Sequence, residues 1–318
     1  MTMTMAKNKI TLNVKGVRGD RSIPFVVHHF NDGTYQVRVP SISREELTPV
    51  FKISCFVDTL DDLIIAGMLT DIIKRNTRLD RAWVELELTS PAYTRYDRVM
   101  HEDRSDALGL LVFANMVKAT GVDDVILNDP HSEVTVRVLK ALGLCVDVKH
   151  QKDCLLEVMF PNEYDRKSKT FDNIKENYII FCPDAGAKKK LGDVADFTCY
   201  KDRDPKTGKI RGFGIEHYDD LSFLNESRQS ILIIDDICEK GGTFLGTVQA
   251  IRDAGCTLPV SLYVTHGIFP EGTPFEDLTK ALDAIYVHSM PEDAHYRCAL
   301  NISRDGGTFN CVNIYKSF

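Results

Sequence analysis

Hydrophobic positions in the first 150 residues alternate between short apolar runs and longer segments with helical spacing. The short runs predict strands at 53–57, 82–88 and 125–127. The helical spacing predicts helices at 61–74, 106–120 and 133–141, and Gly121 and Gly143 lie close to the ends of the last two. Strands that alternate with helices predict a parallel sheet covered on both faces.

The same alternation restarts further along the chain. Apolar runs predict strands at 177–182, 196–201, 230–234 and 259–265, and helical spacing predicts a helix at 243–254. The run at 230–234 is almost purely aliphatic, which is typical of a central parallel strand. Charged residues, Gly and Pro in 201–214 indicate a mobile flap or a hairpin. We therefore expect an α/β protein of two domains, residues 1–150 and 151–318.

Composition narrows the class of protein. The chain has 318 residues, and its formal net charge of -7 argues against a broad nucleic-acid-binding surface. Its nine cysteines form no C-x-x-C pair, so we expect reduced, mostly buried thiols and no zinc site. The first nine residues lack the apolar segment of a signal peptide, and no run of 18 apolar residues predicts a membrane span. These features favour the cytoplasm.

The segment 231–243 is the strongest chemical signal. It reads as a buried strand, the carboxylates of Asp235 and Asp236, a glycine-rich turn and the start of a helix. Parallel strands end at the ligand crevice of an α/β sheet, where two adjacent carboxylates can accept hydrogen bonds from vicinal ribose hydroxyls. Glycines let backbone N–H groups close around a phosphate at the positive end of a helix. An ordinary strand-to-helix turn with a solvated Asp pair is the alternative.

This segment resembles the ribose-binding signature of phosphoribosyltransferases and of ribose-phosphate pyrophosphokinases. Further segments resemble the second family and follow its order along the chain: Phe30 to Gly33, Tyr93 to Arg98, Phe113 to Asp123, Asn128 to Ser132, Pro183 to Gly186 and Val264 to Phe269. The resemblance implies two phosphoribosyltransferase-type domains, each a mainly parallel sheet flanked by helices, with ATP at their junction. It also implies a homo-oligomer, a dimer or a hexamer.

The resemblance also assigns residues to ATP. Arg95 and Asp97 would hold ATP, and His131 would lie beside its phosphates and Mg²⁺. Phe30 and Asp32 would belong to a loop that contacts the base from a neighbouring subunit. The residues alone leave blander alternatives open: a surface charge for Arg95, and a helix-capping or core position for His131.

The same resemblance assigns the ribose phosphate to Asp184, Asp235, Asp236, Glu239, Lys240, Gly241, Gly242 and Thr243. Asp184 would be a ligand of the ribose or of Mg²⁺. Lys201 and Arg203 resemble the cations of the family's flexible catalytic loop, although both could instead lie on a solvated loop. Lys188 to Lys190 are interpreted as a solvated cluster. The implied reaction transfers the β,γ-diphosphate of ATP to an anomeric hydroxyl and releases AMP.

The sequence departs from the family pattern at residues that bear on the acceptor of the diphosphate and on the adenine region. Lys240 stands in the phosphate loop where the family has a small hydroxyl residue, which would fit a larger 5-substituent such as that of ADP-ribose. Resemblance to a viral branch of the family implies ADP-ribose, NAD salvage and the host cytoplasm as the alternative to ribose 5-phosphate. Thr34 and Tyr96 replace the family's Glu and Gln in the adenine region.

Three other classes of protein share some of these sequence features. A phosphoribosyltransferase would share 235–243 but would need neither Arg95 nor His131. A non-catalytic regulatory homologue would be expected to lose Lys201 and Arg203, and both are present. A P-loop or Rossmann enzyme is disfavoured, because no G-x-x-x-x-G-K-[ST] sequence occurs and the Gly212 to Gly214 segment lacks a strand–turn–helix context.

Overall fold

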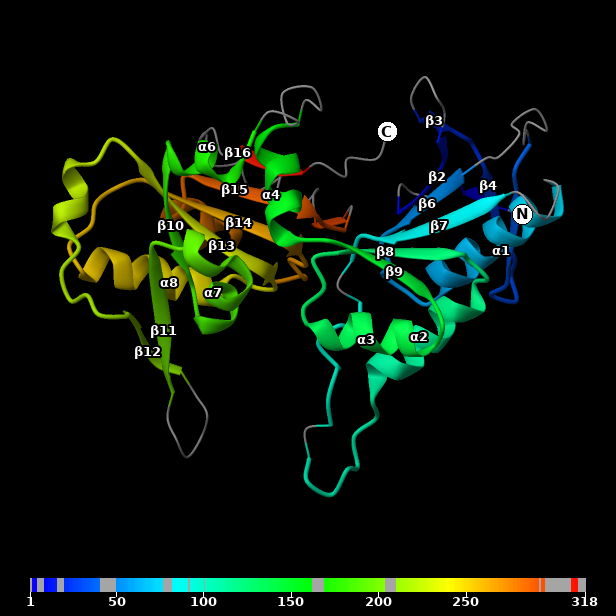
Figure 1. Cartoon of the computed structure of the whole chain (residues 1–318), viewed down its shortest axis with the longest axis horizontal. Coiled ribbons are helices and arrows are strands. Elements are labelled where there is room, and N and C mark those ends of the chain that lie inside the picture. The colour runs from blue at the N-terminus through cyan, green and yellow to red at the C-terminus, as the bar shows by residue number, and fades with distance from the viewer. Residues whose placement is uncertain are drawn as a thin grey trace. The chain divides into compact units, whose positions relative to one another are not determined.

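The structure of the protein, a computed structural model, describes residues 2–4, 9–15, 20–40, 50–76, 82–90, 92–99, 101–161, 169–203, 210–291, 293–294 and 310–313. At 2–4, 202–203, 210–211 and 310–313 it describes the backbone alone. The chain divides into two compact units, Met1–His150 and Gln151–Tyr315, which we call unit 1 and unit 2 (Figure 1).

Unit 1 contains a six-stranded sheet in the order β3-β2-β6-β7-β8-β9 and a three-stranded sheet in the order β1-β4-β5. Its strands are β1 (Thr2–Thr4), β2 (Ile10–Lys15), β3 (Arg21–Ser22), β4 (Val26–His29), β5 (Tyr35–Arg38), β6 (Val50–Cys55), β7 (Trp83–Leu88), β8 (Asp124–Asn128) and β9 (Cys145–Lys149). Its helices are α1 (Asp61–Asn76), α2 (Gly109–Ala119) and α3 (Glu133–Ala141). Strands β6 to β9 are parallel, whereas β2 is antiparallel to both β3 and β6.

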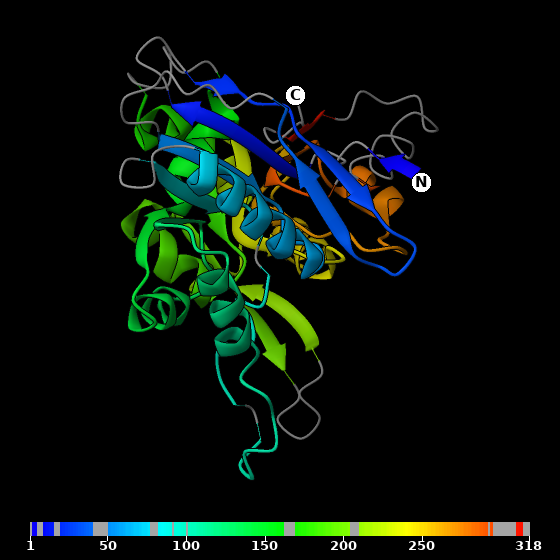
Figure 2. The same cartoon turned by 90° about the vertical axis from the view of Figure 1, so that its right-hand side faces the viewer.

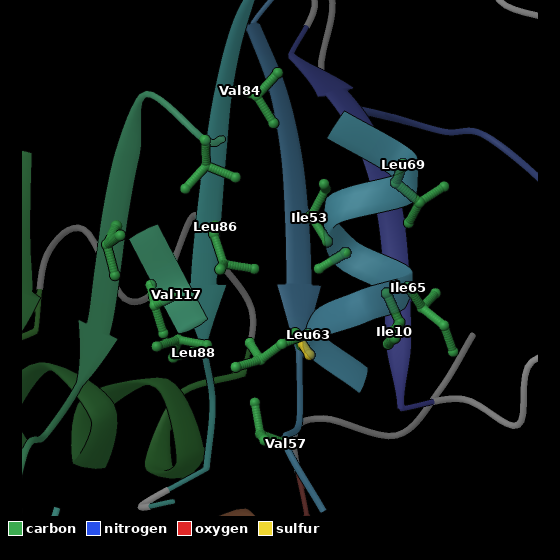
Figure 3. Packing of buried hydrophobic residues seen from close by; sticks show 14 of the residues in the cluster. Ile10, Ile53, Val57, Leu63, Ile65, Leu69, Val84, Leu86, Leu88 and Val117 are labelled. Atoms are coloured by element: carbon green, nitrogen blue, oxygen red, sulfur yellow. The ribbon is translucent and has the colours of Figure 1, made fainter. Parts of the chain in front are cut away.

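The three helices of unit 1 pack on one face of its large sheet. Buried residues of α1 and α2, such as Leu69 and Val117, pack with alternate strand residues such as Ile53 and Leu86 (Figure 3). Leu139 of α3 belongs to the same hydrophobic core. Strands β6 to β9 are neighbours in chain order, so right-handed connections place every helix on the same side. The prediction of helices on both faces is therefore wrong for the described part of unit 1.

Unit 2 contains a seven-stranded sheet in the order β12-β11-β10-β13-β14-β15-β16. Its strands are β10 (Tyr178–Cys182), β11 (Phe197–Arg203), β12 (Ile210–Ile215), β13 (Ser230–Cys238), β14 (Val260–Gly267), β15 (Ala284–Ser289) and β16 (Asn310–Asn313). Its helices are α4 (Gln151–Met159), α6 (Phe171–Lys175), α7 (Ala185–Leu191), α8 (Gly242–Asp253) and α9 (Phe275–Ala281), with short 3₁₀ turns η1 (Gly192–Val194) and η2 (Ser222–Glu226). All neighbouring strands are parallel except β11 and β12, which form an antiparallel ribbon visible in Figures 1 and 2.

Helices cover both faces of the unit 2 sheet. Residues Ile231 and Ile233 of β13 belong to the core beneath α8 and α9, and Leu232 and Ile234 belong to the core beneath α4, α6 and α7. A central strand covered on both faces has no solvated side, which explains the continuous aliphatic run of β13. The predicted fold class is confirmed: two mainly parallel sheets are flanked by helices.

The seven cysteines whose side chains are described are unpaired thiols, and all but Cys145 are buried. Burial raises the pKa of Cys182 and of Cys199 to about 12. Both thiols therefore stay protonated at neutral pH and pack as small apolar groups. Among the described helices, none has the length and apolar character needed to cross a membrane.

The face of the large unit 1 sheet opposite the described helices carries an ion cluster around a buried glutamate. The Glu87 side chain on β7 is only 1% exposed. It pairs with Lys52 on β6 at 2.9 Å and with Lys149 on β9 at 3.2 Å, and it accepts a hydrogen bond from Ser54 Oγ at 2.7 Å. Burial raises the pKa of Glu87, but the two lysines outweigh it and hold this pKa well below its usual range. The cluster thus ties β6, β7 and β9 together on the sheet face opposite the described helices.

We expect Glu87→Gln to lower the free energy of unfolding by about 3 kcal/mol at pH 7, because the two lysines keep their buried positions without their carboxylate. A lowered pKa stabilises the fold above the unfolded value near 4, and this contribution is lost as the pH falls. Urea unfolding at pH 7 and at pH 3 measures both effects. Glu85→Gln is the matched control, since its partner Lys15 is 43% exposed and such pairs contribute below about 1 kcal/mol. Equal losses in the two variants would contradict the prediction.

Candidate active site

The unit 2 sheet changes direction between β10 and β13. From β10 the chain continues to β11 on one side, and it later returns to place β13, β14 and β15 on the other side. Ligands of open α/β sheets bind outside the carboxyl ends of the strands at such a point. The segments that follow β10 and end β13 contain Asp184, Asp235 and the 239–243 loop. Topology therefore gathers the predicted ribose phosphate residues of unit 2 at one edge.

Asp184 begins helix α7 directly after β10. Its Oδ1 accepts hydrogen bonds from the backbone N–H groups of Gly186 at 3.0 Å and Ala187 at 3.1 Å, and its Oδ2 accepts one from Lys201 Nζ at 2.9 Å. Burial raises the pKa of Asp184, but the hydrogen bond and charge of Lys201 and the two backbone N–H groups lower it further, so it stays below its usual range. Asp184 is therefore a carboxylate at neutral pH.

Asp235 and Asp236 lie within β13, which extends four residues beyond the predicted end at 234. Successive strand residues point to opposite faces, so Asp236 lies on the α7 side and Asp235 on the α8 side. The Asp236 backbone N–H donates to Asp235 Oδ1 at 2.9 Å. Burial raises the pKa of Asp235 well above its usual range, and the charges of Asp236 and Asp184 raise it further, against the opposing charge of Lys201. The two carboxylates thus differ in environment although they are adjacent in sequence.

Lys190 belongs to this edge, although the sequence interpretation placed it in a solvated cluster. It lies in the last turn of α7 and its Nζ donates to Asp236 Oδ2 at 2.8 Å. Asp236 is only 8% exposed, so the pair is largely withdrawn from water. Lys188 and Lys189 are exposed, as expected for a solvated cluster. Three consecutive lysines do not show in the sequence which of them faces the protein interior. Only their helical spacing from Ala187 and Leu191, which are buried, could have indicated Lys190.

The loop between β13 and α8 has the backbone of a phosphate cradle. Gly241 is the residue before α8 and has φ of 83°, a conformation that favours glycine. A Cβ at Gly241 would also lie 2.7 Å from Leu278 Cδ2 of α9, so a larger residue would have to displace the Leu278 side chain. Gly242 faces open space, and Glu239 and Lys240 are exposed. The first N–H groups of a helix lack partners within it, so this loop offers donors to an anion.

Lys201 lies on the β11–β12 ribbon, which confirms a hairpin at 201–214 for its described residues. Its side chain is 16% exposed and reaches Asp184, so it is not a solvated loop charge, and its predicted catalytic role stays a prediction. Arg203 ends β11, but its side chain lies outside the described residues, and its predicted role stays a prediction.

The candidate ATP residues of unit 1 follow β7 and β8, which are neighbours in the sheet. Ser132 Oγ donates to Asp97 Oδ2 at 2.6 Å and so joins the two strand-end segments. Arg95 and His131 are exposed, so His131 is not a core histidine. The N-cap residue of α3 is Ser132, so His131 is not the helix cap either. The structure therefore brings the 95–97 segment and the 131–132 turn together.

Phe30 and Asp32 lie in the turn of the β4–β5 hairpin, which belongs to the three-stranded sheet. Asp32 Oδ1 accepts hydrogen bonds from Thr34 Oγ1 at 2.7 Å and Thr34 N at 3.0 Å, and these bonds lower the pKa of Asp32. Phe30 is 43% exposed. In Figure 2 the hairpin runs beside α1, and Tyr35 at its base donates to Asp61 Oδ2 at 3.1 Å. The hairpin thus presents an exposed aromatic side chain beside a carboxylate that forms the turn.

Among the described residues, no group of three or more His, Cys, Asp and Glu side chains is arranged to hold a metal ion. Mg²⁺ usually keeps several waters and is held by one or two carboxylates together with substrate phosphates. Asp184, an ionised carboxylate that follows β10, fits that role as a single protein ligand. The imidazole of His131 is a less suitable donor for this hard cation than a carboxylate.

Comparisons with known proteins find similar chains and a similar fold. No family model matches the chain. Curated ribose-phosphate pyrophosphokinases are similar to it: that of Ralstonia nicotianae is 25% identical over 270 residues, 82% of this chain and 76% of that protein. That of Sulfurisphaera tokodaii is 24% identical over 296 residues, 89% of this chain and 91% of that protein. The crystal structure of phosphoribosylpyrophosphate synthetase from Mycobacterium smegmatis covers 93% of this chain, and this chain covers 87% of it, with a TM-score of 0.63 and 18% identity.

The fold is α/β, with two mainly parallel sheets flanked by helices, and it resembles that solved structure along most of the chain. The sequence comparisons confirm the predicted resemblance to the ribose-phosphate pyrophosphokinase family along most of the chain.

We expect Asp235→Asn to raise the free energy of unfolding at pH 7. The pKa of Asp235 is raised by folding, so ionisation of this carboxyl opposes the folded state at any pH above the unfolded value near 4. Below that pH both states are protonated and the gain disappears. Urea unfolding at pH 7 and pH 3 tests this, with the exposed Asp219→Asn as the control. Destabilisation by Asp235→Asn at pH 7 would show that the carboxylate contributes bonds that outweigh its burial.

Proposed function

We propose that the protein is an ATP-dependent diphosphokinase that transfers the β,γ-diphosphate of ATP to the anomeric hydroxyl of a ribose 5-phosphate unit. The observation that carries the proposal is the unit 2 edge, where Asp184 with Lys201, Asp235, Asp236 and the glycine loop occupy one topological switch point. Curated relatives that resemble the chain along most of its length are ribose-phosphate pyrophosphokinases.

The unit 2 edge suits a ribose phosphate. The 239–243 segment contains Gly241 and the first residues of α8. The helix N-terminus supplies N–H donors and positive potential for the 5-phosphate. Asp235 and Asp236 supply acceptors for the ribose hydroxyls. Lys190 Nζ donates to Asp236 Oδ2 at 2.8 Å, and this hydrogen bond holds the Asp236 carboxylate in place.

The unit 1 residues suit the nucleotide. Arg95 is exposed and always cationic, so it can pair with the phosphates of ATP. His131 is exposed at the carboxyl end of β8 beside the turn that binds Asp97. Phe30 offers an exposed ring for the adenine, and supply of this hairpin by a neighbouring subunit would make the enzyme a homo-oligomer.

The transfer needs little covalent chemistry from the protein. The anomeric oxygen attacks the β-phosphorus in line, the bond to the α,β-bridging oxygen breaks, and AMP leaves with that oxygen while the hydroxyl proton is released. Lys201 would stabilise the charge that develops on the transferred group. Mg²⁺ would neutralise phosphate charge when bound, and Asp184 is the residue that fits it. Positioning can supply much of the acceleration.

The decisive test is AMP release from ATP and Mg²⁺ with ribose 5-phosphate or ADP-ribose as acceptor, with products identified by mass spectrometry. We expect AMP and a ribose that carries a 1-diphosphate. Lys201→Ala and His131→Ala should each lower turnover by about 100-fold or more, as expected for loss of a transition-state contact. Lys189→Ala, an exposed change on α7, is the control. Circular dichroism verifies folding of each variant.

Two outcomes would contradict this assignment. Absence of AMP with either acceptor in the unmodified protein would favour a transferase that consumes such a diphosphate, or a regulatory homologue. Near-normal turnover in a folded Lys201→Ala or His131→Ala variant would remove that residue from the reaction.

The acceptor within this reaction depends on Lys240. Its side chain is exposed in the phosphate loop, where the family has a small hydroxyl residue. A second cation there suits a 5-substituent with more than one phosphate, such as the diphosphate of ADP-ribose. ADP-ribose, whose use would serve NAD salvage, is therefore the second candidate acceptor.

We expect Lys240→Thr to lower the ratio of activity with ADP-ribose to activity with ribose 5-phosphate by about tenfold, because one charge-assisted contact contributes roughly 1.5 kcal/mol. Values of kcat/KM for the two acceptors measure this ratio. Lys188→Thr, an exposed lysine on α7, serves as the control. An unchanged ratio would show that Lys240 does not select the acceptor.

A further inference from the structure

Helix α8 contains a glycine that its own helical structure does not require. Gly246 lies in the helix interior, where glycine is less favourable than alanine. A Cβ built on Gly246 would lie 2.1 Å from Cε2, 2.3 Å from Cδ2 and 2.6 Å from Cζ of Phe213 on β12. The Phe213 ring therefore occupies the space that a side chain at position 246 would fill. We call this contact the Phe213 notch.

The Phe213 notch is directly linked to Lys201. Phe213 on β12 is the cross-strand partner of Lys201 on β11. Opposed residues of an antiparallel pair share a face, with Cβ atoms about 5 Å apart. On this same ribbon Lys201 Nζ reaches Asp184 Oδ2 at 2.9 Å. A shift of the Phe213 ring would therefore move Lys201 as well.

The neighbouring pair of the ribbon is held in the same manner. Tyr200 pairs with Gly214, and a Cβ at Gly214 would lie 2.5 Å from the Tyr200 ring. Successive pairs face opposite sides, so one ring packs against each face of the ribbon base. The ribbon therefore has a defined position on α8, at the cross-strand pair formed by Lys201 and Phe213.

The helix that forms the notch also forms the phosphate loop. Helix α8 begins at Gly242, and Gly246 lies four residues further, about one turn along the same helix. We propose that Phe213 and Gly246 are positioning residues, which fix Lys201 relative to the phosphate loop through a single rigid helix. This inference rests on the proposed function for its effect on turnover, but the docking itself does not depend on it.

We expect Gly246→Ala to displace the ribbon. Turnover should fall about tenfold or more, because displacement of a catalytic group by about 1 Å has effects of this size. The KM for ribose 5-phosphate should stay within about twofold, since the loop at 239–243 is unchanged. Hydrogen–deuterium exchange of the amides of β11 should become faster in the variant. The double variant with Phe213→Ala removes all the clashing ring atoms and should recover part of both changes.

Gly67→Ala is the matched control. Gly67 lies within helix α1, where an added Cβ meets Thr120 at an ordinary 3.5 Å, so this change should leave turnover unaltered. Unchanged exchange and turnover in Gly246→Ala would overturn the proposal, as would a rise in KM alone or absence of recovery in the double variant. If the unmodified protein releases no AMP, the proposed function fails while the exchange data still decide whether the ribbon is docked.

Discussion

The ion pair between Lys201 and Asp184 links the parts of unit 2 that the candidate site requires. Asp184 caps α7 after β10, and Lys201 lies on the ribbon formed by β11 and β12. Near it, the largely buried Asp236 pairs with Lys190 of α7, and Asp235 carries a raised pKa. Three carboxylates at one sheet edge repel each other, and the two lysines offset that repulsion. Such an edge is stable because its cations offset the charge of its carboxylates.

The two units differ in how topology arranges chemistry. In unit 1 the strands β6 to β9 follow chain order, so all three helices pack on one face and the other face carries the Glu87 ion cluster. In unit 2 the order reverses at β10 and β13, the kind of point at which ligands of open α/β sheets bind. The same alternation of strands and helices therefore produces a one-sided sheet in one case and a two-sided sheet in the other.

Glycines of unit 2 act through close packing as much as through backbone conformation. Gly241 needs both a positive φ and the absence of a Cβ against Leu278, whereas Gly246 and Gly214 serve as contact surfaces for aromatic rings. These contacts connect α9, α8 and the ribbon to the phosphate loop. The loop and Lys201 are consequently supported by shared packing, and not by the short segments that contain them.

Local sequence was sufficient for features that local physics controls. The spacing of apolar residues placed α3 and the core of β13, and the order of short motifs indicated the family resemblance that the comparisons confirm. Each depends on residues close together in the chain, because helical periodicity, aliphatic runs and loop motifs are local properties.

Tertiary structure decided what depends on distant residues. Lys190 and its two neighbours look alike in sequence, and only the packing of α7 against β13 turns Lys190 toward Asp236. The end of β13, the one-sided cover of unit 1 and the Phe213 notch likewise arise from contacts between segments far apart in the chain. Sequence alone indicated the α/β fold class and the family that the chain resembles, and it identified most side chains of the candidate site. The partner and ionisation of each group were set by the fold, because burial and neighbouring charge exist only after the chain has packed.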